Sequence, residues 1–506
     1  MLGQLRDQPL FLLLMAIGAL SMFLPAAHAL AVQNFFEART FFYSGTLFLL
    51  IVALVTLAMW GRVRKRGSMG DLLALFACFV VLPAMLAVPL YETIRTTSFL
   101  NAYVEMVSSL TTTGASLFDA DRLSTTQHLW RAQVGWLGGL LMWIAAAAIL
   151  APLNLGGFEV TASAEPGRGE GTERGLDTTD PQRRILKISG QLIPIYGGLT
   201  LALWIMMVIS GDRPLVALCH AMSVMATSGI SPIDGAQSAS SGIPGEVVMA
   251  LFMLFALSRL TFSSDTITTA RRGIHTDPEF RLGMVVVITV PALLFLRHWW
   301  GAEAVDGTQA GGVMIALRAL WGSIFTALSF LTTTGFVSAE WETAQLWSGM
   351  STPGLIFLGL SLVGGGVATT AGGVKLLRVW ALYLNGLREM DRLVHPSSVG
   401  RSTGMSRRIR KKGAYIAWIF FMLFALSLSG FTVIFAALGL SFEDAIVLSI
   451  SALSTTGPLI TIAPENSLGL LELASTAKLA FCAAMILGRL EMLAIIALLT
   501  SDVWRS

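Results

Sequence analysis

Long apolar segments separated by short polar ones dominate the chain, and two kinds of apolar segment recur in a fixed order. A segment long enough to cross a bilayer is followed by a shorter one, and then by a second long one. A transmembrane helix needs about 20 apolar residues, whereas segments of about 10–14 residues are candidates for re-entrant helices. The pattern therefore predicts membrane–pore–membrane units, in which the short segment is the pore helix.

We expect four such units after an N-terminal two-helix hairpin. The hairpin comprises spans 9–31 and 41–60, joined by a turn at 33–40. The span, pore helix and span are expected at 72–91, 98–112 and 129–152; at 185–209, 214–227 and 243–270; at 281–300, 313–333 and 353–387; and at 413–438, 442–455 and 469–500. The corresponding divisions of the chain are 1–71, 72–184, 185–280, 281–412 and 413–506. The predicted fold is an all-α polytopic membrane protein whose four repeats have a pseudo-fourfold arrangement.

A short Ser/Thr-rich stretch that ends in glycine follows each predicted pore helix. The four copies are SSLTTTG, SVMATSG, SFLTTTG and SALSTTG, and they end at Gly114, Gly229, Gly335 and Gly457. Small residues also serve close helix packing in membranes, which would account for one copy. Four copies at intervals of 115, 106 and 122 residues indicate an internal repeat instead.

These stretches are suited to cation binding. Irregular backbone at membrane depth is tolerated where it lines a water-filled cavity, and glycine permits angles that place consecutive carbonyls on one side. Four such strands around an axis would form a ring of carbonyl oxygens that replaces the water shell of a monovalent cation. The C-terminal dipole end of each pore helix would also favour a cation there.

The last long segment of repeat three is interrupted. Residues 361–375 read SLVGGGVATTAGGVK, with five glycines within ten residues, so this part cannot be a plain helix.

Composition agrees with a single polytopic membrane unit. The 506 residues are 54% hydrophobic and 13% charged, with a mean hydropathy of +0.71, whereas soluble proteins carry about 25% charged residues. The three cysteines, Cys78, Cys219 and Cys482, lie in separate apolar segments and are interpreted as core residues. The chain has no HExxH motif and no paired intramembrane aspartates, so we do not expect an enzyme.

Charge placement predicts the orientation. The loops 61–71, 271–281 and 386–412 are basic, and short basic loops stay cytoplasmic. Both termini are then cytoplasmic, and the Gly-terminated ends of the pore segments face outward. The first apolar stretch is long for a signal peptide and is interpreted as an uncleaved helix. The basic loop 386–412 could enforce orientation only, or could also dock a partner.

With these motifs in place, the chain resembles the superfamily of Trk, Ktr and HKT cation transporters over nearly its whole length. The most specific matches are SLTTTGAS, FLTTTGF, GGGVATTAGGVK and GRLE at 488–491, and the N-terminal hairpin resembles the Trk-type pore subunits. The resemblance implies potassium uptake (with rubidium as a substitute), a homodimer in the bacterial inner membrane and a cytoplasmic nucleotide-binding regulatory subunit. Potassium is then the substrate. No covalent cofactor and no nucleic-acid partner are expected.

By the same resemblance, the selectivity filter that holds potassium comprises Thr112, Thr113, Gly114, Thr227, Ser228, Gly229, Thr333, Thr334, Gly335, Thr455, Thr456 and Gly457. The gate comprises Gly364, Gly365, Gly366, Thr369, Thr370, Gly372, Gly373, Lys375 and Arg489. Two departures are ATSG in repeat two and Pro458 directly after the fourth glycine. In the family, a serine in place of the first filter glycine accompanies sodium permeation. A sodium or sodium-coupled transporter is therefore the alternative, and Gly114 argues against it.

Intramembrane charges are costly and are functional by default. Arg259, Lys375 and Arg489 follow their repeats' glycines at similar distances, which suggests a similar depth below the filter. Long basic side chains can also snorkel to the inner interface, and for Arg259 and Lys375 both readings stay open. For Arg489 we expect hydrogen bonds to carbonyls of the interrupted segment that hold it across the pore.

Overall fold

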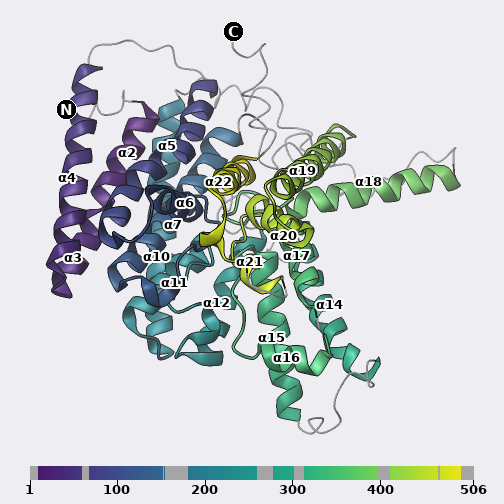
Figure 1. Cartoon of the computed structure of the whole chain (residues 1–506). Helices are drawn as coiled ribbons and strands as arrows, with labels where there is room; N and C mark the ends of the chain where they lie inside the picture. The colour runs from purple at the N-terminus through teal and green to yellow at the C-terminus, as the bar shows by residue number, and fades with distance from the viewer. Residues whose placement is uncertain are drawn as a thin grey trace.

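The computed structural model describes residues 9–59, 68–151, 153, 181–258, 277–300, 313–350, 352–395, 411–464 and 468–491. Every regular element among them is helical (Figure 1). Eight of the described helices are long and apolar enough to cross a membrane. The first span of repeat one, α5 (Ser68–Ile94), has 27 residues. At about 1.5 Å per residue it is about 40 Å long, enough for a hydrocarbon layer of about 30 Å.

The N-terminal hairpin packs against repeat one. It comprises α2 (Leu10–Ser21), α3 (Phe23–Ala31) and α4 (Phe35–Ala58). The expected turn at 33–40 was wrong, because α4 begins at Phe35, where the Asn34 side chain accepts a hydrogen bond from Glu37 N (3.3 Å). Helices α2 and α4 contact α5, and α3 contacts α7 (Thr125–Ala145).

The four short helices expected before the glycine motifs are present. They are α6 (Phe99–Leu110), α11 (Pro214–Ala226), α15 (Val313–Leu331) and α20 (Phe442–Leu453). Local signals begin them: the Ser98 and Ser441 hydroxyls accept from Asn101 N and Asp444 N, and Pro214 occupies the first turn of α11. Helix α15 has 19 residues, but it ends in the glycine motif like the other three.

The long helices of the repeats match their expected places, except at four ends. They are α5 and α7 (Thr125–Ala145, continued by the π-turn η2, Ala146–Leu150); α10 (Pro181–Ile209) and α12 (Gly242–Met253, continued by η4, Leu254–Leu257); α14 (Pro278–Trp300), α17 (Gly354–Val363) and α18 (Leu376–Val394); and α19 (Lys411–Ala437) and α22 (Ser475–Leu490). The helix that follows the interrupted segment, α18, runs to Val394, so the first part of the expected basic loop 386–412 is helical. The other three ends belong to the second span of repeat two and to the last span.

The second span of repeat two does not run as one helix through 243–270. It ends at Leu257, and Ser258 is extended (φ −142°, ψ 135°); residues 259–270 lie outside the described residues. The cause is a tertiary contact, since the Ala256 carbonyl accepts a hydrogen bond from Gly366 N (2.9 Å). Arg259 and most of the basic loop 271–281 also lie outside the described residues.

The last span does not begin at 469 either. The short helix η7 (Leu470–Glu472) precedes α22, which begins at Ser475. Helix α22 ends at Leu490, and Glu491 has a positive φ of 64°, which breaks the helix.

Four of the described short elements, each lying between a glycine motif and the next span, were not expected from the sequence. They are α16 (Trp341–Ser348), α21 (Leu459–Ile462), η1 (Ala120–Arg122) and η3 (Ala236–Ser238).

The repeats are arranged in a closed ring. Each pore helix contacts the second span of the repeat before it: α11 contacts α7, α15 contacts α12 and α20 contacts α17. Helix α6 contacts α22 and so joins the first repeat to the last. At that junction Lys478 Nζ donates to Asn101 Oδ1 (2.9 Å). This cyclic order is the predicted pseudo-fourfold arrangement.

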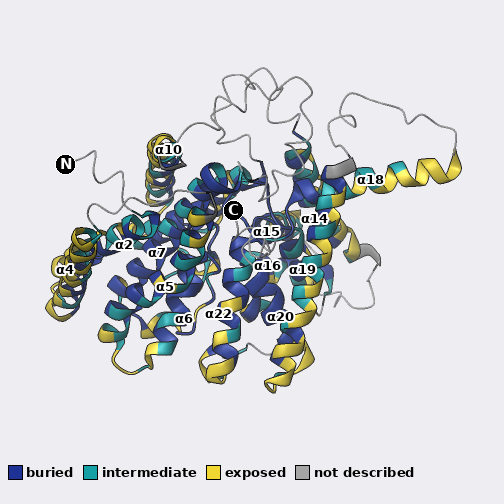
Figure 2. Cartoon of the chain, turned by 90° about the horizontal axis from the view of Figure 1, so that it is seen from above, coloured by how far each residue is buried: buried dark blue, intermediate teal, exposed yellow. Residues whose placement is uncertain are grey.

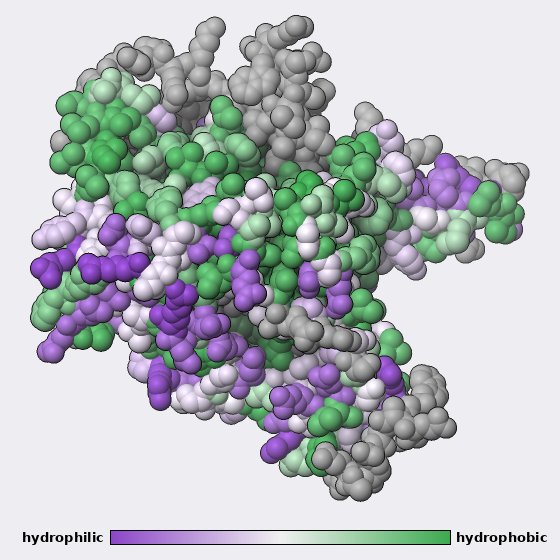
Figure 3. Space-filling view, in the orientation of Figure 1, coloured by the Kyte–Doolittle hydropathy of each residue, from purple (hydrophilic) through white to green (hydrophobic). Residues whose placement is uncertain are grey.

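Residues near the centre of the ring are buried, and residues at its periphery are exposed. Pore helices and the motifs after them are buried, whereas α4 and the far end of α18 are exposed (Figure 2). Exposed apolar side chains on the outer helices, such as Leu54, Ile288 and Leu426, face where lipid chains would lie. In Figure 3, hydrophobic side chains cover the upper part of the visible face, and hydrophilic ones gather lower down and on α18. The amphipathic helix α18 projects from the bundle (Figure 1).

Candidate functional site

The four Gly-terminated motifs form turns of the same design, here called the TxG turns (112–114, 227–229, 333–335 and 455–457). The first residue of each is a threonine with a left-handed φ: Thr112 (55°), Thr227 (49°), Thr333 (57°) and Thr455 (53°). A left-handed β-branched residue is uncommon and strained. These threonines, rather than the glycines alone, therefore end the pore helices and redirect the chain.

A serine six positions before each glycine closes the turn. The four are Ser108, Ser223, Ser329 and Ser451. Their carbonyls accept hydrogen bonds from the residue before the glycine, at 2.9 Å in all four turns. The serine was part of the sequence motif, but the hydrogen bond that its carbonyl accepts could be identified only in the structure.

The four turns meet one another around a common centre. A Cβ added to Gly114 would lie 1.6 Å from the Ser228 carbonyl oxygen, and one on Gly229 would lie 2.3 Å from that of Thr334. One on Gly335 would lie 2.8 Å from Pro458 Cγ, and one on Gly457 would lie 2.0 Å from Ala115 N. Only glycine fits in contacts of this kind. The twelve predicted filter residues are therefore brought together.

The interrupted segment of repeat three lies directly against these turns. Residues 364–375, here called the Gly-rich loop, connect α17 to α18, with positive φ at Gly364 (73°) and Gly373 (77°). Gly372 N donates to the Thr333 hydroxyl (2.8 Å), and the Thr227 hydroxyl lies 3.2 Å from that of Thr370. The loop therefore contacts the first residue of two TxG turns.

Close packing also holds the loop against repeats four and two. A Cβ on Gly372 would lie 2.0 Å from the Ser454 carbonyl oxygen, and one on Gly366 would lie 2.8 Å from Leu257. Gly365 O accepts from Leu376 N (2.9 Å), and the Thr369 hydroxyl donates to Gly366 O (2.7 Å). The loop is an ordered structure under the turns rather than a loose connection.

Arg489 reaches the loop as the sequence predicted. Its Nη1 donates to the Thr370 carbonyl (2.6 Å), and the residue is 4% exposed. Among the described groups, its Nε and Nη2 have no hydrogen-bond partner. The Lys375 ammonium donates to the Ala371 carbonyl, also within the loop. Two buried cations therefore bind loop carbonyls; a role in gating remains a prediction.

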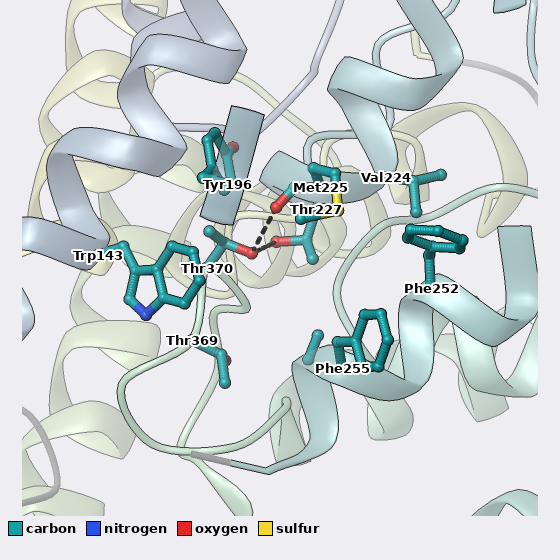
Figure 4. A pocket seen from close by; sticks show the side chains of 10 residues that line it. Trp143, Tyr196, Val224, Met225, Thr227, Phe252, Phe255, Thr369 and Thr370 are labelled. Carbon is teal, nitrogen blue, oxygen red and sulfur yellow. Dashed lines mark hydrogen bonds between the residues drawn. The ribbon is translucent and has the colours of Figure 1, made fainter. Parts of the chain in front are cut away.

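Unfilled space adjoins the loop. A small pocket lies under the second TxG turn, lined by Trp143, Tyr196, Val224, Met225, Thr227, Phe252, Phe255, Ala256, Thr369 and Thr370. In Figure 4, Thr370 points at Thr227 and at the Met225 carbonyl, with the Phe252 and Phe255 rings on the α12 side. The loop therefore borders a small pocket on that side.

Buried charges around the turns were mostly missed from the sequence. Glu105 pairs with Arg131 (2.5 Å), and its other oxygen accepts from Leu117 N (2.8 Å). Glu246 on α12 accepts from Trp321 Nε1 (2.8 Å), Ser338 Oγ (2.7 Å) and Ala339 N (2.6 Å). The sequence did contain a signal for them, because Glu105 and Glu246 are acidic residues inside apolar segments.

One further buried ion pair lies beside the loop. Arg378, at the start of α18, is 2.7 Å from Glu491, and its guanidinium lies 3.5 Å from the Phe420 ring centroid. Such contacts between helices distant in sequence have no local sequence signal.

The ring of repeats and the buried turns define the class: an all-α polytopic membrane protein with four membrane–pore–membrane repeats. Comparison with known proteins identifies the family within this class. The chain belongs to the TrkH family of cation transport proteins, which matches residues 38–503.

Named relatives support this placement. The chain is 28% identical over 421 residues to the Trk system potassium uptake protein TrkH of Vibrio parahaemolyticus, covering 81% of this chain and 80% of the relative. It is 26% identical to that of Salmonella typhimurium, covering 90% and 91%. The crystal structure of the potassium transporter TrkH from Vibrio parahaemolyticus superposes with a TM-score of 0.79 over 99% of each chain, at 24% identity, which shows a shared fold.

Proposed function

We propose that this protein takes up potassium across the bacterial inner membrane through a central pore lined by the TxG turns. The observation that carries the proposal is the ring of contacts among the four turns, buried at the ends of four pore helices. Carbonyl oxygens held in this way replace the water shell of a monovalent cation. Relatives named potassium uptake proteins support potassium as that cation.

The Gly-rich loop is the gate in this proposal. It lies under the turns, bonded to Thr227 and Thr333, and Arg489 holds it through the Thr370 carbonyl. Arginine keeps its charge, so it repels cations from the closed path and fixes the loop. Loop movement away from the turns opens the path.

Assembly is part of the same proposal. The family resemblance implies a homodimer and a cytoplasmic nucleotide-binding regulatory subunit, and the projecting helix α18 supplies exposed surface for such a partner. Neutralising Arg407, Arg408, Arg410, Lys411 and Lys412 while preserving orientation is expected to weaken co-purification with the regulatory subunit. The loss should be largest at low salt, where these charges are least screened.

Flux from the purified protein tests the transport function. Rubidium uptake into liposomes is expected to exceed that of empty liposomes and to be inhibited by external potassium more than by sodium. Equal inhibition by the two ions would favour the sodium alternative, and no uptake, even with Arg489 removed, would contradict transport by this chain.

A further inference from the structure

Each TxG turn continues into an outward segment, and in repeats one and three the pore helix holds that segment by the same contact. The Glu105 carboxylate, nine positions before Gly114, accepts from Leu117 N, three positions after it (2.8 Å). The Thr326 hydroxyl, nine positions before Gly335, accepts from Ser338 N, three positions after it (3.3 Å). Both contacts anchor the chain just beyond the turn.

Repeat two keeps the anchor in an altered form. The residue three positions after Gly229 is Pro232, which has no N–H to donate. His220, nine positions before that glycine, lies with Nε2 2.9 Å from the Ser231 hydroxyl instead. The anchoring position is therefore polar and bonded in three repeats.

Repeat four lacks this anchor. Its corresponding residue is Leu448, whose side chain has no hydrogen-bonding atom. The amide three positions after the glycine, Ile460 N, donates to Gly457 O (3.1 Å) at the start of α21. The fourth turn thus leads into a short helix of its own and is not held by its pore helix at this position.

The fourth turn also differs in conformation. Gly114, Gly229 and Gly335 have positive φ (72°, 67° and 83°), whereas Gly457 does not. The amides of Gly114 and Gly335 donate back to Ser108 O and Ser329 O on their own pore helices. Gly457 N donates instead across the ring to the Thr113 carbonyl (2.6 Å).

That bond occupies an oxygen that a cation would need. A carbonyl that accepts an N–H at this distance points its oxygen at a partial positive charge, which a potassium ion would have to replace. Pro458 adds bulk at the same level, because its Cγ lies 2.7 Å and 2.8 Å from the positions of a Cβ on Gly229 and Gly335. These contacts involve the middle residue of the first turn and the last residues of the other turns, whereas the Gly-rich loop contacts first residues.

We propose that the fourth TxG turn is a second closure of the path, at the outer end, in which the Gly457 amide and the Pro458 ring take the place of a potassium ion. Potassium binding and this arrangement exclude each other. The inference rests on the proposed function, because it assumes that the turns bind potassium. It differs from the Gly-rich loop in residues, in position and in its direct competition with the ion.

The variant Pro458→Ala tests the closure by removing the ring atoms near Gly229 and Gly335. If the open turn is about a tenth of the population in the parent, potassium affinity rises by up to about tenfold when closure is lost. Isothermal titration of purified protein with potassium in choline buffer measures this. Pro353→Ala is the matched control, because Pro353 caps α17 as Pro458 caps α21, and we expect parental affinity.

A flux measurement and an exchange measurement complete the test. In an Arg489→Ala background, Pro458→Ala is expected to raise rubidium uptake several-fold with potassium preference retained. In the parent, hydrogen exchange of the segment containing Gly457 is expected to be faster in potassium than in choline, since the ion displaces the bond to Thr113. The exchange measurement needs no substitution and holds even if Pro458→Ala folds poorly.

The outcomes separate the two proposals. Suppose that the parent and Pro458→Ala bind potassium with equal affinity, and that the hydrogen-exchange rate at Gly457 is the same in potassium and in choline. The outer closure is then wrong, and the transport function stands. If neither the parent nor the Arg489→Ala protein binds potassium or carries rubidium, the proposed function fails, and the closure fails with it.

Discussion

The Arg378 guanidinium and the Glu491 carboxylate form a buried ion pair, with Nη2 2.7 Å from Oε2, between the start of α18 and the end of α22. Arg378 follows the Gly-rich loop, and Glu491 lies two residues after Arg489, which holds that loop. The pair therefore links the two parts of the proposed gate, the Gly-rich loop and Arg489. A displacement of α18 would be transmitted through this pair to Arg489, which holds the loop.

Breaking this pair is expected to be costly. Removing one partner of a buried ion pair typically costs about 3–5 kcal/mol, whereas replacing both with apolar residues of similar size costs much less. Glu491→Leu should therefore lower the unfolding temperature in detergent more than Arg378→Met/Glu491→Leu does. Arg392→Met, which removes an exposed pair with Glu389, is the control and should change it little. Equal losses in the single and double variants would show that the pair does not couple the two helices.

Removal of the Arg489 side chain is expected to open the path. Arg489→Ala, or deletion of about five residues within 364–373, should raise rubidium uptake by the pore subunit alone and leave ion selectivity unchanged, because the TxG turns are not altered. A closed state favoured by a few kcal/mol is enough for such a switch. Uptake at or below the parental level in both variants, with normal folding and yield, would mean that this contact is not the barrier.

Gly114→Ser is expected to relax selectivity. The added Cβ would lie 1.6 Å from the Ser228 carbonyl oxygen at a φ of 72°, so the first and second turns must move apart. The ratio of potassium to sodium permeability should fall, as measured by competition for rubidium uptake. Gly386→Ser on α18, where an added Cβ meets nothing within 4 Å, should keep the parental ratio. An unchanged ratio in Gly114→Ser would exclude this turn as a determinant.

Glu246→Gln is expected to loosen the segment after the third turn. The carboxylate accepts three hydrogen bonds, from Trp321, Ser338 and Ala339, and an amide group cannot accept all three. Each hydrogen bond to a charged group is worth about 1.5–3 kcal/mol, so thermal stability should fall clearly. The exposed Glu342→Gln on α16 is the control. A parental unfolding temperature in Glu246→Gln would show that water satisfies these donors equally well.

Local pattern in the sequence was enough to predict the repeats and the four pore helices. The contact between Arg489 and the Gly-rich loop was predicted from the family resemblance together with the position of Arg489 on the last span. Apolar length and a motif repeated four times are carried by neighbouring residues, so they are visible without the fold. The start of α4 was predicted too late because Phe35–Thr40 was interpreted as a polar turn. Glu37 is buried there, and its side chain lies 3.5 Å from that of Gln127, a partner far along the chain.

Details of the turns could not be predicted for the same reason. The sequence gives each motif a threonine and a glycine, but whether the glycine adopts a positive φ depends on what holds the segment beyond it. In repeat four Leu448 offers no acceptor and Gly457 bonds to Thr113, a residue of another repeat. The partnership of Arg378 with Glu491 likewise depends on how α18 and α22 pack.

The junction between α6 and α22, with Lys478 bonded to Asn101, determines when the ring of repeats can close during synthesis. A growing chain leaves the ribosome with its first repeat lacking a neighbour on one side, and that neighbour is made last. Three completed repeats leave the ring open, so it cannot close until translation has passed Lys478. A message truncated before that codon therefore yields helices in the bilayer without a closed ring.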